Sequence, residues 1–141
     1  MKKDAIQFDI DMGPLMSYLR VVVYDLPPNT TFWPVFDDLK ARMRRFKLNP
    51  DEYDQKSLYN CSGQLIHDGT YNMLVVERYS EELVAHEASH AATRMIEYLH
   101  IQETGGDELH AFITGYICGK VADGLREHRK KARKCPKKKK K

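Results

Sequence analysis

The chain has 141 residues, of which 42% are hydrophobic, and this suits a single domain with a modest core. No run reaches the ~18 to 20 apolar residues that span a bilayer, and three widely spaced cysteines argue against a disulfide framework and favour a reducing, cytoplasmic setting. The net charge of +3 combines two regions: residues 129–141 hold ten of the 23 Lys and Arg and no acid, whereas the remaining 128 residues carry a net charge of −7.

The first half of the chain predicts a strand and a helix after an irregular start. Residues 1–18 show no clear period and are expected to form an irregular N-terminal arm. Leu19–Tyr24 is a β-branched run that ends before a Pro-Pro pair, which predicts a strand. Trp33–Phe46 carries apolar residues at helical spacing, so we expect a helix there. Asn49–Glu52 then has the composition of a helix start, with a capping residue, a proline and two acids.

The second half predicts a hairpin followed by two helices. Gln64–His67 and Tyr71–Arg78 are strand-like and are joined across Asp68-Gly69, a strong hairpin signal. Ser80 is a suitable N-cap for a helix that extends to about residue 99. A further helix is expected from about residue 107 towards residue 128.

This order of elements predicts a small α+β domain over residues 19–128, with a short mixed or antiparallel sheet. Residues 129–141 are too charged to bury, so we expect a disordered Lys/Arg-rich tail. Such a run can contact nucleic acid without sequence preference, because counterions are released from the phosphates when cations bind. A solubilising tail is the alternative.

The expected helix after Ser80 carries the motif His-Glu-x-x-His, formed by His86, Glu87 and His90. Residues four apart share a helix face, so both imidazoles can bind one Zn²⁺ ion at about 2.0–2.1 Å. Glu87 can then act as general base toward a water on that ion. The alternative is two histidines that merely share a helix surface.

A catalytic zinc usually has three protein ligands. Glu108 lies 18 residues after His90, beyond Gly105-Gly106, and is our preferred third ligand. Asp107 and His110 compete with it, although His110 is about 200° round the helix from Glu108, so both cannot face the metal.

These segments resemble the small zincin-like metallopeptidase family encoded by tailed bacteriophages, over residues 20 to about 119. The matching positions are Val84, His86, Glu87, His90, Ala91, Glu108, Ala111, Phe112, Gly115 and Tyr116. The resemblance implies a minimal gluzincin, in which a short sheet and hairpin pack on the His-Glu-x-x-His helix and the following helix supplies the third ligand. It also implies peptide-bond hydrolysis. One departure is Phe112, which stands where thermolysin-like enzymes place an acid that orients a zinc histidine.

Two features of such a site have more than one candidate in this sequence, namely the oxyanion-stabilising group and the strand that binds the substrate. The group that stabilises the oxyanion has five candidates: Tyr71, Tyr79, His67, His110 and Tyr116. The strand over residues 71–78 is either the edge that pairs with an extended substrate or an internal strand.

The leading hypothesis is therefore a zinc-dependent metallopeptidase-like hydrolase with His86, His90 and Glu108 as ligands and Glu87 as base. Its partner would be a peptide or protein, without a membrane, in the host cytoplasm if the chain is phage-encoded or in a virion. The alternative is a non-enzymatic phage virion or assembly protein with a structural or vestigial zinc site. A third hypothesis is nucleic-acid association through residues 129–141.

Overall fold

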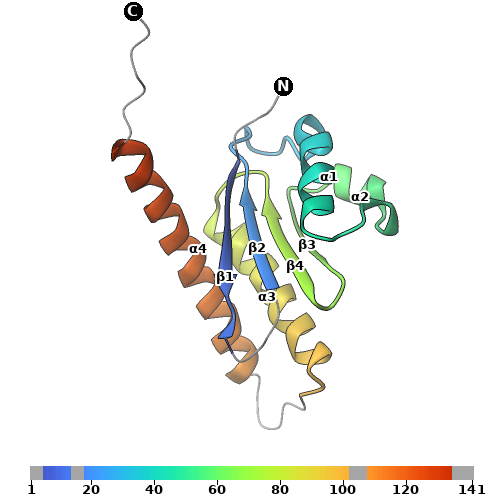
Figure 1. Cartoon of the computed structure of the whole chain (residues 1–141), viewed down its shortest axis with the longest axis vertical. Helices are drawn as coiled ribbons and strands as arrows, with labels where there is room; N and C mark the ends of the chain where they lie inside the picture. The colour runs from blue at the N-terminus through green and yellow to red at the C-terminus, as the bar shows by residue number, and fades with distance from the viewer. Residues whose placement is uncertain (1–4, 14–17, 102–107, 135–141) are drawn as a thin grey trace, which may run out of the picture.

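A four-stranded mixed sheet with helices packed on it forms the fold of this computed structural model, which describes residues 5–13, 18–101 and 108–134 (Figure 1). The strands are β1 (Ile6–Asp11), β2 (Tyr18–Val23), β3 (Gly63–His67) and β4 (Tyr71–Val76), in the order β1-β2-β4-β3. β2 and β4 are parallel, while β1 and β3 each pair antiparallel with their neighbour. The predicted α+β class with a short mixed sheet is confirmed.

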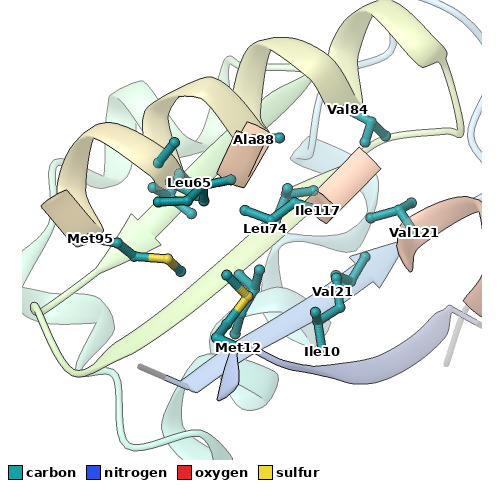
Figure 2. Packing of buried hydrophobic residues seen from close by; sticks show 14 of the residues in the cluster. Ile10, Met12, Val21, Leu65, Leu74, Val84, Ala88, Met95, Ile117 and Val121 are labelled. Atoms are coloured by element: carbon teal, nitrogen blue, oxygen red, sulfur yellow. The ribbon is translucent and has the colours of Figure 1, made fainter. Parts of the chain in front are cut away.

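The two faces of the sheet support two separate cores. The helices are α1 (Phe36–Arg45), α2 (Gln55–Tyr59), α3 (Glu81–Tyr98) and α4 (Glu108–Lys134), with short 3-10 turns η2 (Trp33–Val35) and η3 (Pro50–Glu52). Side chains alternate across β2, so Val21 joins the core under α3 and α4, while Val22 joins the core under α1 and α2. Figure 2 shows the first of these cores, in which Leu74 lies near Ile117.

Several predicted elements are confirmed. The apolar spacing of residues 33–46 forms η2 and α1, whose Leu39 and Met43 are buried. The Asp68-Gly69 turn joins β3 and β4, with Gly69 at a φ of 99°. Ser80 caps α3, because its hydroxyl oxygen accepts a hydrogen bond from the backbone N–H of Leu83 at 3.4 Å.

The expected irregular arm is wrong over residues 6–11, which form β1. Ile6, Phe8 and Ile10 alternate with polar residues. This period-2 pattern is typical of a strand, and β1 pairs with β2 along its whole length. The acids at positions 9 and 11 face outward on this edge strand, where charge is common because it discourages edge-to-edge association.

The prediction of a disordered tail is also wrong over residues 129–134. α4 continues through residues 129–134 and ends at Lys134. Lys and Arg are good helix formers, and cations are favoured at a helix C-terminus by the helix dipole. Residues 135–141 lie outside the described residues.

Candidate metal centre

α3 presents opposite kinds of residue to the core and to solvent. Ala88, Ala91 and Ala92 are fully buried, so the helix lies close to the elements beneath it. His86 and His90 are exposed on the outer side, and the His86 side chain retains 67% of its accessible surface. The small residues of the motif helix therefore leave both imidazoles accessible at the surface.

The two imidazoles point toward each other. Their Nε2 atoms are 3.1 Å apart, and the rings meet edge to face with centroids 4.7 Å apart. Two nitrogens bound to one tetrahedral zinc at about 2.0–2.1 Å would be about 3.3 Å apart. The observed separation therefore fits two ligands of a single ion. The same distance also allows one ring to donate a hydrogen bond to the other.

Glu87 lies between this pair and the sheet. Its residue is only 5% exposed, and its Oε1 is 3.9 Å from the Nε2 of His86. Burial raises the pKa of the Glu87 carboxyl above its usual range, while the nearby His86 and His90 and a backbone hydrogen bond from Leu65 oppose that rise. A carboxyl whose pKa is raised in this way binds a proton more readily than an exposed one, as a general base requires.

A polar groove of about 250 Å³ runs between α3 and β3 at this position. It is lined by Gly63, Gln64, Leu65, His67, His86, Glu87, His90 and Arg94. β3 is an edge strand and β4 is internal. Of the two alternatives for residues 71–78, the internal strand is therefore correct and the substrate-pairing edge is not. An extended peptide could therefore pair with β3 beside the histidines, but not with β4.

The structure does not bring Glu108 to the histidine pair. Glu108 is the exposed first residue of α4, and its spacing places it on the opposite side of that helix from the buried Ile113 and Ile117. Ala111 is exposed as well, so it does not mediate a close approach of the two helices. Within residues 5–13, 18–101 and 108–134, no three His, Cys, Asp or Glu side chains are arranged to hold a metal.

Asp107 and His110 were the candidates that compete with Glu108 as third ligand. Asp107 lies outside the described residues. His110 contacts α3, where its Nε2 is 3.0 Å from the carbonyl oxygen of Ser89 and 3.1 Å from the hydroxyl of Thr93. Ser89 precedes His90 in the sequence and Thr93 lies one turn after Ser89, so both are on the same side of His90 on the helix surface. Of the two described candidate ligands on α4, His110 and not Glu108 thus hydrogen-bonds to the motif helix.

Of the five oxyanion candidates, His67 is the one that lines the groove. Burial and the charge of Arg94 lower the pKa of His67, which favours its neutral form. Tyr71 stacks on Tyr18 in a different part of the sheet, with ring centroids 5.2 Å apart. The hydroxyl of Tyr116 donates to the carbonyl oxygen of Asp11, and Tyr79 packs against the core.

The sequence interpretation missed two kinds of groove residue. Arg94 falls four residues after His90, so its place on the same helix face could have been found from the period alone. Gln64 and Leu65 could not have been predicted as groove residues in this way. Their proximity to α3 depends on the position of β3 at the edge of the sheet, and strand order is set by long-range pairing.

Comparisons with known proteins identify no relative: no protein-family model, no curated protein and no solved structure matches this chain. Among the described residues, no helix combines the length and apolar character needed to cross a membrane.

Proposed function

We propose that the protein is a zinc-dependent hydrolase that cleaves peptide bonds in the groove between α3 and β3. The observation that carries this proposal is the 3.1 Å separation of the His86 and His90 Nε2 atoms, with the buried Glu87 carboxylate next to them. When bound there, zinc would supply a Lewis acid and lower the pKa of a coordinated water.

The chain's own residues have distinct roles in this proposal. His86 and His90 hold the ion through their Nε2 atoms. Glu87 accepts the proton of the attacking water at its carboxylate, because its buried position favours the protonated form. The edge of β3 binds the substrate in an extended conformation, and the neutral His67 can donate a hydrogen bond to the developing oxyanion.

Glu108 remains the proposed third ligand, on the basis of its place in the sequence. It can join the pair only if the first turn of α4 is reoriented, since its side chain now faces away from the core. His110 already reaches α3 at Ser89 and is the competing candidate. The two assignments are separable by mutation.

Metal content of purified protein, measured by mass spectrometry, tests the ligand set. We expect one zinc per wild-type chain and its loss in His86→Ala and His90→Ala. Of Glu108→Ala and His110→Ala, the variant that loses zinc identifies the third ligand. His128→Ala is a matched control, because this exposed histidine lies far along α4 from the motif. A wild-type chain that refuses added zinc would overturn the proposal.

Turnover on a peptide library tests the chemistry separately from binding. Zinc-loaded wild-type protein should cleave, whereas zinc-loaded Glu87→Gln should keep the metal and lose cleavage by about 10²-fold or more. Retained cleavage in a fully loaded Glu87→Gln protein would show that another group is the base.

A non-catalytic zinc site is the second candidate function. The observation that favours it is the lack of a three-ligand arrangement among the described residues, because a pair of histidines falls short of the three protein ligands of a catalytic zinc and matches a vestigial site. It predicts bound zinc, no turnover by wild-type protein, and a melting temperature that falls on chelation because the ion stabilises only the folded state.

A further inference from the structure

The C-terminal third of α4 extends beyond the domain. Leu125 is the last buried residue of this helix, and every residue from 126 to 134 is exposed. At 1.5 Å per residue, these nine residues continue the helix by about 13 Å. Figure 1 shows this end running away from the sheet toward the C-terminus of the chain.

Local interactions account for a helix in a segment that has no core beneath it. Six of the nine residues from 126 to 134 are Lys or Arg, which are strong helix formers. Arg126 pairs with Asp123 at 2.7 Å and Lys130 with Glu127 at 3.8 Å, both three residues apart on the helix surface. These exposed pairs are weak, so the cations can exchange them for stronger anionic partners.

Five cations of the segment lie on one helix face, which we call the basic stripe. They are Arg126, Arg129, Lys130, Arg133 and Lys134, at positions i, i+3, i+4, i+7 and i+8. At about 100° per residue they span an arc of about 140°. The line of buried residues that ends at Leu125 is centred on the opposite side of the helix, so the stripe faces solvent.

We propose that the basic stripe binds duplex DNA, with the end of α4 in the major groove and its cations against the phosphates on either side. The major groove admits one α-helix, and a helix placed there has phosphates along both flanks. An arc of about 140° covers both flanks, whereas a single row of cations would reach one. This binding is independent of the proposed metal site.

The composition of the stripe disfavours the other polyanions. A helix that lies on a membrane needs an apolar face, and Ala132 is the one apolar residue among residues 126–134. Single strands are held by stacking on aromatic side chains, and this segment has no Phe, Tyr or Trp. The major groove of A-form RNA is too deep and narrow for side chains to read.

Two double variants of the full chain separate a binding face from mere charge. Lys130→Gln with Lys134→Gln removes two cations of the stripe. Lys120→Gln with Lys131→Gln removes two exposed cations whose mean direction is about 120° round the helix from the centre of the stripe. Both variants lose the same charge through the same substitution, and both retain residues 135–141.

Binding to a 20-base-pair duplex would be measured by fluorescence anisotropy between 50 and 200 mM salt, with helix content checked by circular dichroism. Wild-type protein should bind with steep salt dependence. In the stripe variant the slope of log K against log salt should fall by about 2, and affinity at 100 mM salt should drop by roughly tenfold or more. The control variant should change the slope by less than about 0.5.

Four outcomes would overturn the proposal. Equal losses in the two variants would show attraction without a defined face. Tighter binding to a single strand of the same length, or to phosphatidylserine vesicles, would indicate a different polyanion. Wild-type chains that ignore DNA but associate with each other, in a manner lost in the stripe variant, would show that the stripe binds the acidic body of a second copy.

Discussion

Two buried glutamates, Glu77 directly after β4 and Glu87 within α3, differ in the hydrogen bonds that their carboxylates accept. They are 3% and 5% exposed. Both oxygens of the Glu77 carboxylate accept backbone hydrogen bonds, from Asn29 at 3.1 Å and from Thr31 at 2.7 Å. Glu87 accepts one from the backbone of Leu65 and otherwise faces an open groove with two imidazoles.

The difference shows that burial of an acid does not by itself indicate chemistry. Asn29 and Thr31 have φ angles of 61° and 64°, a left-handed conformation that is strained for a β-branched residue such as threonine. Glu77 holds this loop in place by accepting hydrogen bonds from the loop's backbone N–H groups. Both oxygens of the Glu77 carboxylate therefore have a structural role. Glu87 makes fewer such bonds and borders solvent-accessible histidines, as its proposed role as a base requires.

Replacing Glu77 should have the largest effect. Glu77→Ala removes two hydrogen bonds to a charged acceptor and releases the strained loop, so we expect a loss of about 2–4 kcal/mol in the free energy of unfolding. Urea denaturation measures it. Glu77→Gln keeps one acceptor oxygen and should lose less. A loss below about 1 kcal/mol in Glu77→Ala would mean that water replaces the carboxylate and that Glu77 is not structural.

Replacing Glu87 should have a much smaller effect on stability. The amide oxygen of Glu87→Gln can still accept the Leu65 hydrogen bond, and the substitution removes a carboxylate that burial disfavours. We expect the free energy of unfolding of metal-free protein to change by less than about 1 kcal/mol. A loss as large as that of Glu77→Ala would assign Glu87 to the fold and remove the basis for its proposed role as a base.

The same pair of glutamates shows how far the sequence could predict the site. The helical period and the Ser80 cap located α3, so the relation of His86, Glu87 and His90 followed from local geometry. The role of Glu77 did not, because its partners are 46 and 48 residues away. Contacts of that separation depend on the parallel pairing of β2 with β4, which no local pattern specifies.

Glu108 illustrates a prediction that spacing alone could not support. Its distance from His90 along the chain suits a third ligand, but the phase of α4 is set by its buried line, Ile113, Ile117, Val121 and Leu125. Extending that four-residue spacing backward reaches Leu109, which packs against the core, whereas Glu108 lies about 140° round the helix from Ile113. The spacing of the apolar residues of α4 therefore argued against Glu108 as the third ligand, whereas the motif on α3 gave no information on this point.

The reactivity of Cys61 offers a finer comparison of the two glutamates. Burial raises the pKa of the Cys61 thiol to about 11, and the charge of Glu87 and, more weakly, that of Glu77 add to the rise. Because the thiolate is the reactive form, alkylation of folded protein at pH 8 should be roughly tenfold or more slower than in urea-unfolded chain. The rate should climb as pH rises toward 11.

Glu87→Gln should accelerate this alkylation several-fold at pH 8, because it removes the larger of the two neighbouring charges and so lowers the thiol pKa. Glu77→Gln should accelerate it less. Cys118 is an internal control, since burial alone accounts for the raised pKa of its thiol and neither glutamate contributes. Peptide mass spectrometry after brief iodoacetamide treatment resolves the two sites. Equal acceleration at both cysteines would indicate general loosening of the fold, whereas an unchanged rate at Cys61 would mean that Glu87 is already protonated and neutral in the metal-free protein.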